Sequence, residues 1–449
     1  MKRELFEKLI KWKNSPGRKP LIIRGARQVG KTWLMKEFGR TNYDQTIYLN
    51  FEKNKRLGNL FTDGFEIKRV ITALQAESGF TINPENTLLI FDEIQSVPEA
   101  ITSLKYFYED GPQYHIIAAG SLLGMAIHSN VSFPVGKVAF MDLHPLTYPE
   151  FLDALNENPL IEILQTCDWR LITAYKSGYI ERLRQYYYVG GMPEAVLRFS
   201  ENNNFREVRD IQKQILESYE HDFSKHAPAA IVPRIRMLWN SIPSQLAKEN
   251  RKFIYGLVRE GSRAKDYELA LSWLIDCGQV SQVCRITKPG IPLKAYEDRG
   301  AFKLFMVDIG LLSAMTDIDS NTLLEGNTIF TEFKGSLTEQ YVFQQIISAG
   351  KFPVYYWSSE RSTAEVDFVI QHENNFIPVE VKAEENLKAK SLKVFTDTFT
   401  PALSVRTSMS DFRIKDQFMN LPLYAISIIE KALGQGAESG EQGAGRTTA

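Results

Sequence analysis

GARQVGKT, at residues 25–32, is the stretch that decides the fold of the first part of the chain. It follows the apolar run PLIIRG at 20–25 and opens a helical pattern at 31–39, and its glycines, lysine and threonine have the spacing of a phosphate-binding P-loop. Glycines let backbone N–H groups turn towards phosphate oxygens, and the start of a helix adds partial positive charge. The alternative is a bare glycine-rich turn. We predict ATP binding by Gly25, Ala26, Arg27, Gln28, Val29, Gly30, Lys31 and Thr32.

A second apolar run, LLIFDE at 88–93, predicts a central strand that ends in two carboxylates. Lys31 would pair with the β- and γ-phosphates, and Thr32 would ligate Mg²⁺. Asp92 would hold the water shell of Mg²⁺, and Glu93 would polarise the attacking water as a catalytic residue. Open α/β sheets bind ligands at the carboxyl ends of their strands, where these side chains are expected.

Three further residues are weaker candidates for the same site. Ser121 ends the predicted strand HIIAAGS and could sense the γ-phosphate, although a serine there can equally cap a helix or turn. Arg27 and Lys137 could stabilise developing charge, with an exposed surface cation as the alternative for both.

The first 200 residues alternate strand-like and helix-like segments. Strands are predicted at 20–25, 46–51, 87–93, 114–121 and 137–143, and helices at 31–39, 66–78 and 98–109. Strands alternating with helices favour an α/β domain with a parallel sheet, and continuous apolar strands fit a sheet covered on both faces.

The middle of the chain has a different pattern, from about 205 to 320. Helical stretches at 206–220, 234–247 and 264–278 precede two strand-like pieces at 281–287 and 302–308, which suggests a winged helix. Residues 231–310 hold 13 Lys/Arg against 8 Asp/Glu, a net charge of +5. This modest basic bias suggests DNA as a partner and is also compatible with a solvated face.

A helix at 337–350 and strands VYYWSS, AEVDFVI and FIPVEVKA predict an α+β domain near the C-terminus. If Ile370 pairs with Ile377 across the loop QHENNF, Asp367 lies opposite Glu380, and Lys382 shares the face of Glu380. Val366, Phe368, Val379 and Val381 would then point the other way, into a core.

Two carboxylates placed opposite each other repel unless a cation joins them, and a hard divalent metal ion prefers such oxygen ligands. Asp367 and Glu380 would hold Mg²⁺ against a scissile phosphate, and Lys382 would stabilise the developing charge. Glu339, on the preceding helix, could add a metal ligand or a base. The alternative is a solvated hairpin face in which Lys382 is the counterion.

The chain resembles the AAA-type ATPases that carry a C-terminal restriction-endonuclease-like domain of the PD-(D/E)xK type. Five motifs together carry this resemblance: GARQVGKT, LLIFDEIQ, IIAAGSLLG, HPLTYPEF and YVGGMPEAV. The resemblance covers most of residues 1–430. It implies an ATPase core, a helical lid near Gly190 and Gly191, a winged helix and a nuclease-like fold that can be catalytically silent. Relatives often carry arginine at the position of Lys137, so any arginine-finger role there lacks its usual residue.

The composition limits the remaining possibilities. The 449 residues include 53 Lys+Arg and 54 Asp+Glu, a net charge of −1, which excludes a uniformly basic nucleic-acid coat. Three cysteines make neither a disulfide framework nor a zinc knuckle, so we expect reduced thiols and a cytoplasmic protein. No apolar run approaches the roughly 18 residues of a membrane helix.

We therefore predict an α/β P-loop domain with a helical lid at 1–200, a helical and winged-helix domain at 201–325, a restriction-endonuclease-like domain at 326–433 and a disordered, glycine-rich tail at 434–449. ATP hydrolysis would govern a module that acts on DNA. The alternative is an ATP-driven regulatory switch whose nuclease-like domain is only a binding scaffold, and a homo-oligomer remains open.

Overall fold

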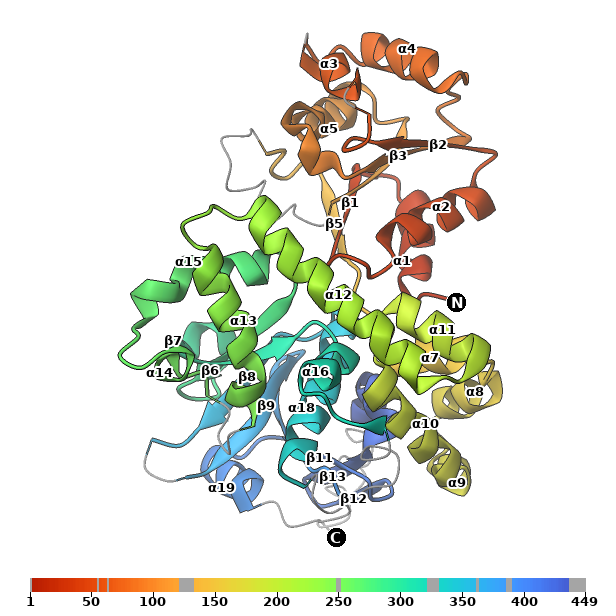
Figure 1. The fold of residues 1–449 in the computed structure, drawn as a ribbon. Coiled ribbons are helices and arrows are strands. Elements are labelled where there is room, and N and C mark those ends of the chain that lie inside the picture. Colours follow the sequence, from red (N-terminus) through yellow and green to blue (C-terminus); the bar gives the residue numbers. More distant parts are fainter. Residues whose placement is uncertain are drawn as a thin grey trace. The chain divides into compact units, whose positions relative to one another are not determined.

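The computed structural model describes residues 2–54, 56–62, 64–120, 133–247, 252–320, 331–360, 363–384 and 390–435, with only the backbone of residues 62 and 331–333. The chain forms two compact units, coloured along the sequence in Figure 1. Unit 1 consists of Met1–His144 and Ser272–Gln279, and unit 2 consists of Pro145–Leu271 and Val280–Ala449.

Unit 1 is built on a parallel sheet of five strands in its described part, in the order β2-β3-β4-β1-β5. The strands are β1 (Leu21–Arg24), β2 (Gln45–Asn50), β3 (Thr87–Asp92), β4 (His115–Ala119) and β5 (Ala139–Asp142). All four neighbouring pairs are parallel, which confirms the predicted α/β sheet. β3 and β4 are buried along their whole length, as expected of strands covered on both faces.

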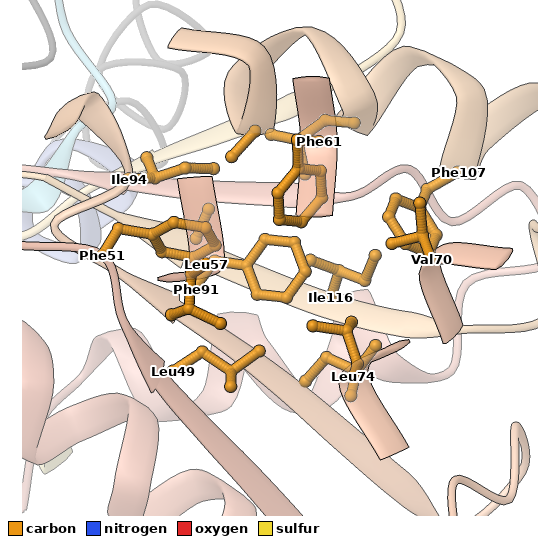
Figure 2. Packing of buried hydrophobic residues seen from close by; sticks show 14 of the residues in the cluster. Leu49, Phe51, Leu57, Phe61, Val70, Leu74, Phe91, Ile94, Phe107 and Ile116 are labelled. Atoms are coloured by element: carbon orange, nitrogen blue, oxygen red, sulfur yellow. The ribbon is translucent and has the colours of Figure 1, made fainter. Parts of the chain in front are cut away.

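Helices cover both faces of this sheet (Figure 1). One face carries α3 (Arg56–Thr62), α4 (Ile67–Ser78) and α5 (Pro98–Asp110), and the other carries α1 (Leu5–Lys13) and α2 (Lys31–Asn42). Under α3, α4 and α5 lies an aromatic-rich core, in which Phe91 of β3 packs 5.4 Å from the ring of Phe51 and 6.2 Å from those of Phe61 and Phe107 (Figure 2). This packing holds β3 in place, and with it the carboxylates of Asp92 and Glu93 at its end.

Unit 2 begins with helices. These are α7 (Tyr148–Ala154), α8 (Asn158–Thr166), α9 (Trp169–Ala174), α10 (Lys176–Val189), α11 (Pro193–Asn202), α12 (Phe205–His226), α13 (Val232–Leu246), α14 (Tyr255–Val258) and α15 (Ala264–Asp276), of which the residues up to Leu271 belong to this unit. Two later helices are α16 (Ile309–Met315) and α18 (Thr331–Ala349).

The strands of unit 2 form one mixed sheet, in the order β12-β13-β11-β10-β9-β8-β6-β7. They are β6 (Val280–Ile286), β7 (Glu297–Met306), β8 (Val354–Ser358), β9 (Glu365–His372), β10 (Asn375–Val381), β11 (Ser404–Ser408), β12 (Arg413–Lys415) and β13 (Phe418–Pro422). Helix α19 (Lys390–Phe399) follows β10, and a 3₁₀ segment at Leu423–Ile428 follows β13.

The two strands predicted as a wing do pair with each other as the antiparallel hairpin β6–β7. Their environment differs from the expectation, because β6 also pairs in parallel with β8 through Arg285 with Tyr356 and Ile286 with Trp357. The predicted boundary at 325/326 therefore crosses a continuous sheet, and the boundary at 200/201 lies inside unit 2. The reason is long-range packing: Ile286 is fully buried in one cluster with Trp357 and Val366.

Of the predicted tail, only Gly434 and Gln435 are among the described residues, and both are helical there. No helix in the described ranges combines the length and apolar character needed to cross a membrane.

Candidate nucleotide site and carboxylate cluster

The loop between β1 and α2 has the backbone of a phosphate cradle. Gly25, Gln28 and Gly30 all have positive φ, of 143°, 67° and 95°. A Cβ on Gly25 would lie 2.2 Å from the carbonyl oxygen of Leu143, so no larger residue fits there. The loop ends in a left-handed Gly30, after which Lys31 begins α2. The first backbone N–H groups of the helix thus face the loop, as anion binding at a helix start requires.

Lys31 lies inside this loop. Its side chain is buried, and Nζ donates to the carbonyl oxygens of Gly25 and Ala26, at 2.8 Å each. Burial lowers the pKa of Lys31 to about 8, while the charges of Glu93 and Asp92 act in the opposite direction. The ammonium group is therefore held at the centre of the loop with little solvent around it.

Asp92 stands at the end of β3 and accepts two hydroxyl hydrogen bonds. Thr32 Oγ1 and Tyr48 Oη both donate to its Oδ2, at 2.7 Å each. The structure thus brings together the residues predicted from GARQVGKT and LLIFDE, 60 positions apart. Tyr48, on the neighbouring strand β2, was not predicted; it stands in TIYLNF, where an aromatic residue carries no signal of its own. Burial raises the pKa of Tyr48 to about 12, so it remains a hydrogen-bond donor.

Glu93 has a left-handed backbone, with φ 51° and ψ 42°. Such a conformation costs a non-glycine residue about 1–2 kcal/mol and marks functional turns. The turn points the chain away from β3 directly after Asp92, and Gln95 Nε2 donates to Glu93 Oε2 at 2.6 Å. Glu93 is thereby held directly after Asp92, at the carboxyl end of β3.

The structure places the three weaker candidates, Ser121, Lys137 and Arg27, in different environments. Ser121 lies outside the described residues. Lys137 Nζ is 3.0 Å from Glu109 Oε1 and 5.3 Å from the centre of the Tyr108 ring, so its charge is engaged within unit 1. Arg27 is half-buried in the loop.

The hairpin β9–β10 in unit 2 has the predicted register. Ile370 pairs with Ile377, and the ladder runs from His372 with Asn375 to Phe368 with Val379. Asp367 is the residue before Phe368, and Glu380 is the residue after Val379, so the two lie next to the last of these pairs. The negative charge of Asp367 raises the pKa of Glu380. The hairpin therefore brings both carboxylates together, as the sequence predicts.

The predicted alternation of side chains holds only in part. Val366, Phe368, Val379 and Val381 are all buried. Val366, however, packs in a cluster with Phe395 of α19, whereas the ring of Phe368 lies 6.2 Å from Phe343 of α18. The register of β8 against β9 shifts between Tyr355 and Trp357, and this bulge breaks the alternation next to Asp367.

A lysine from outside the hairpin lies among the acidic side chains. Lys303 of β7 is fully buried, and its Nζ is 2.5 Å from Glu365 Oε1, 3.7 Å from Glu339 Oε2 and 3.9 Å from Asp367 Oδ1. We name the six side chains Lys303, Glu339, Glu365, Asp367, Glu380 and Lys382 the carboxylate cluster. Lys303 and Glu365 were not predicted, because FKLFMVD and AEVDFVI show only strand patterns at these positions.

Within the cluster, Asp367 and Glu380 each use one oxygen for a local bond. Asp367 Oδ2 accepts from the backbone N–H of Val381 at 2.8 Å, and Glu380 Oε1 accepts from Lys382 Nζ at 2.7 Å. Glu380 Oε2 is buried with no hydrogen-bond partner. Burial raises the pKa of Glu380, and Asp367 raises it further, whereas Lys382 and Lys303 lower it. Within the described ranges, no group of three or more His, Cys, Asp and Glu is arranged to hold a metal ion.

Gly190 and Gly191, which the resemblance places in a helical lid, end α10 in unit 2. The backbone N–H of Gly191 donates to Asp308 Oδ2 at 2.6 Å, and Asp308 also caps α16 through Leu311 N. Gln344 Nε2 of α18 donates to the same carboxylate at 3.1 Å. The two glycines thus join three helices around one buried aspartate.

Three family models match separate parts of the chain. Residues 17–152 match the AAA domain, residues 180–322 match a domain of unknown function (DUF8612), and residues 334–426 match a second domain of unknown function (DUF4143). No curated protein matches the chain. The first match agrees with the parallel sheet and P-loop of unit 1, so this part of the chain is similar to AAA domains in sequence pattern and in fold.

Several solved structures are similar at low identity. The Walker-type ATPase PABY2304 of Pyrococcus abyssi is 15% identical, with a TM-score of 0.45 over 70% of this chain and 95% of that one. The Aeropyrum pernix ORC1 protein in complex with DNA is 12% identical, with a TM-score of 0.27 over 70% and 91%. The Thermotoga maritima RuvB Holliday junction branch migration motor is 12% identical, with a TM-score of 0.26 over 83% and 93%.

Proposed function

We propose that unit 1 binds and hydrolyses ATP. The observation that carries this proposal is the 2.7 Å hydrogen bond from Thr32 Oγ1 to Asp92 Oδ2, at the mouth of a loop that already encloses the Lys31 ammonium group. Residues from the loop after β1, from α2 and from β3 thus meet at the carboxyl edge of a parallel sheet, where α/β proteins bind nucleotides.

The same atoms fit Mg²⁺. A hydroxyl oxygen and a carboxylate oxygen in hydrogen-bond contact are hard donors, and Mg²⁺ is usually held by one or two such ligands together with the substrate phosphates. When bound, the ion neutralises phosphate charge. Thr32 and Asp92 would hold it, Lys31 would bind the β- and γ-phosphates, and Glu93 would orient and polarise the attacking water. The carbonyl oxygens of Gly25 and Ala26 would release Lys31 to the phosphates.

Replacement of the P-loop lysine tests the proposal. Lys31→Ala should lower the rate of ATP hydrolysis at least 100-fold, because a charge in contact with the transferred phosphate is removed in a site with little solvent. The matched control is Arg40→Ala, which removes an exposed cation from the same helix. Phosphate release by Lys31→Ala at the rate of the control would contradict the proposed ATPase function.

For unit 2 we propose a metal-dependent phosphodiesterase site at Asp367, Glu380 and Lys382, with Glu339 beside it. The buried Glu380 Oε2 without a hydrogen-bond partner favours this function, because such an oxygen is costly unless a cation or proton meets it. Asp367 and Glu380 would hold one divalent ion, which would polarise a phosphate, and Lys382 would stabilise the charge that develops on it.

The competing proposal, a non-catalytic scaffold, is favoured by the buried Lys303, which already supplies positive charge to the cluster. Purified protein incubated with Mn²⁺ and plasmid DNA separates the two. Nicking that disappears in Lys382→Ala but persists in Lys31→Ala supports cleavage by unit 2. Intact plasmid in every reaction supports the scaffold.

The function of the whole chain follows as a proposal from these parts. ATP binding and hydrolysis in unit 1 would control a DNA-interacting module formed by α13, α14, α15 and the β6–β7 hairpin, which has the helix and strand order expected of a winged helix. Seven exposed cations on this segment support DNA as the partner: Lys252, Arg259, Arg263, Lys265, Lys288, Lys294 and Arg299. The alternative remains an ATP-driven switch in the cytoplasm, acting alone or as a homo-oligomer.

A further inference from the structure

Arg3, which precedes α1, has its guanidinium group inside unit 1. Only 7% of the residue is exposed. Its Nη1 donates to the carbonyl oxygen of Val29 at 3.1 Å, and its Nη2 donates to the carbonyl oxygen of His144. A buried guanidinium group is costly unless its N–H groups find acceptors, and hydrogen bonds from a charged donor are roughly twice as strong as neutral ones. Arg3 therefore fastens two backbone segments that are far from it in sequence.

The first of these acceptors belongs to the phosphate loop. Val29 is completely buried and stands directly before Gly30, the left-handed residue at the end of the loop. The peptide bond between them is trans, so the carbonyl of Val29 and the N–H of Gly30 point in opposite directions. Because Arg3 holds the carbonyl from one side, the N–H of Gly30 is turned to the other. Backbone N–H groups at this point of a P-loop are the donors that cradle phosphates.

The second acceptor links the end of the loop to the segment beside its start. His144 follows Leu143, and the carbonyl oxygen of Leu143 lies where a Cβ on Gly25 would be. Gly25 begins the loop, and Val29 stands near its end. By donating to Val29 and to His144, Arg3 holds the end of the loop to the same segment that packs on its first residue.

Arg3 is itself held in place by α1. Its carbonyl oxygen accepts a hydrogen bond from the N–H of Phe6 at 2.9 Å, in the first turn of that helix. Leu9 and Trp12 of α1 are buried, and the ring of Phe6 packs edge-on against that of Phe38 in α2, with 5.4 Å between centres. Figure 1 shows α1 next to α2. The guanidinium group is therefore positioned before any nucleotide binds, which lowers the entropy lost on binding.

We propose that Arg3 is a positioning residue for nucleotide phosphates: it holds the carbonyl of Val29 so that the N–H of Gly30 is aimed at a phosphate of a nucleoside di- or triphosphate. The inference rests on the proposed nucleotide binding in unit 1 and adds a residue that lies outside GARQVGKT. Arg3 acts through the backbone of the loop and not by contact with the phosphates. Its charge also polarises the peptide group between Val29 and Gly30, which makes the N–H a stronger donor.

Calorimetric titration of the full chain with ADP tests the inference on Arg3→Met, which keeps a long apolar side chain and removes the guanidinium donors. The affinity for ADP should fall about 10-fold, because one phosphate donor is no longer aimed. The number of sites per chain should stay the same. A merely structural role predicts the reverse result, since partial misfolding removes sites and leaves the affinity of the remaining ones unchanged.

Arg18→Met is the matched control. Arg18 also donates to two backbone carbonyl groups of unit 1, those of Lys13 and Pro112, and both of these acceptors lie outside the phosphate loop. Its replacement should leave the affinity for ADP at the wild-type value. Arg3→Lys keeps a positive charge but loses the planar fork that serves two acceptors, so its affinity should lie about threefold below that of the wild type.

Nuclear magnetic resonance reads the N–H of Gly30 directly. Labelling the valine carbonyl with ¹³C and glycine with ¹⁵N selects the three glycine amides that follow a valine, which are those of Gly30, Gly136 and Gly190. In the wild type, ADP should move the amide proton of Gly30 downfield. In Arg3→Met this shift should be less than about half as large, since a hydrogen bond weakens steeply when it is misaligned. Gly190, whose N–H donates to the carbonyl of Tyr186 at 2.8 Å, is the internal reference.

An affinity of Arg3→Met equal to that of Arg18→Met, or an unchanged shift of Gly30, overturns the inference and leaves nucleotide binding intact. Should Arg3→Met fail to fold, Arg3→Lys decides. A loss of affinity together with a smaller shift of Gly30 then supports the inference, whereas wild-type affinity or a second failure to fold overturns it. A wild type that binds neither ADP nor ATP removes the proposed function and the inference together, so titration of the wild type distinguishes the two failures.

Discussion

Single residues decide the geometry of the candidate nucleotide site in unit 1. Lys31 is held by two carbonyl oxygens of its own loop, and Asp92 by the hydroxyls of Thr32 and Tyr48, so each charged group has neutral partners before any ligand arrives. Such preorganisation keeps the side chains near the geometry that phosphates require, at a low cost on binding. Tyr48 matters here because it donates a second hydrogen bond to the Asp92 oxygen that Thr32 also contacts, and Tyr48→Phe would leave that oxygen with one donor fewer.

The lowered pKa of Lys31 predicts a pH dependence of ATP binding. In the free protein, Lys31 titrates at about 8, and it loses its charge as the pH rises through that value. Bound phosphates add negative charge next to Nζ and raise the pKa, so binding takes up a proton above pH 8. The affinity for ATP should therefore fall about 10- to 30-fold between pH 7.5 and 9.5, as measured by calorimetry.

Lys31→Arg is the control for this pH effect, because the guanidinium group stays protonated over the whole range. Its affinity should be lower than that of the wild type but should not change with pH. An equally steep decline in Lys31→Arg would show that another group is responsible.

At the scale of elements, the junction of α10, α16 and α18 sets the architecture of unit 2. Asp308 is completely buried and accepts hydrogen bonds from Gly191, which lies just after α10, from Leu311 of α16 and from Gln344 of α18. Burial raises the pKa of Asp308, and these hydrogen bonds act in the opposite direction. The glycines of YVGGMPEAV are explained by this close packing.

Gly190→Ala should destabilise unit 2 strongly. Gly190 has φ 72°, and a Cβ there would lie 2.2 Å from Asp308 Oδ1 and 2.7 Å from Gly310 N. Strain and overpacking together should lower the free energy of unfolding by about 3 kcal/mol or more in urea denaturation. The matched control is Gly261→Ala, with φ 76° and nothing within 4 Å of the added Cβ, for which only about 1 kcal/mol is expected. Equal losses in the two variants would contradict the packing role.

At the scale of the whole molecule, the two units have separate sheets and separate candidate sites, and the near-neutral net charge of −1 averages over unlike parts. The exposed cations that flank α14 and those of α15 and the β6–β7 hairpin predict duplex DNA binding that weakens with salt, because binding releases counterions from the phosphates. The near-neutral composition is therefore compatible with the proposed DNA binding.

Arg263→Ala combined with Lys265→Ala should lower the affinity for duplex DNA and reduce the slope of log affinity against log salt by about 2, one for each lost phosphate contact. Fluorescence anisotropy at several salt concentrations measures both quantities. Arg40→Ala, an exposed cation in unit 1, should leave them unchanged. Wild-type binding that does not respond to salt would argue against phosphate contacts in this segment.

The sequence by itself determined the local parts of this protein. GARQVGKT, LLIFDE and the pairing of Ile370 with Ile377 are short-range patterns, in which spacing and apolar runs dictate a loop, a strand and a hairpin register. The expected strands and helices of unit 1 appear close to their predicted bounds for the same reason. Ser121 and most of the predicted tail lie outside the residues that the structure describes.

Tertiary structure alone decided what comes from distant strands. Tyr48 reaches Asp92 because β2 pairs with β3, and Lys303 enters the carboxylate cluster although β7 and the hairpin are more than 50 residues apart in sequence. The sequence around an aromatic residue or a lysine in an apolar strand does not indicate which residue it will contact, since pairing between distant strands depends on the packing of the whole sheet. The same packing joined the predicted wing to the C-terminal sheet through Ile286 and placed a buried cation among its carboxylates.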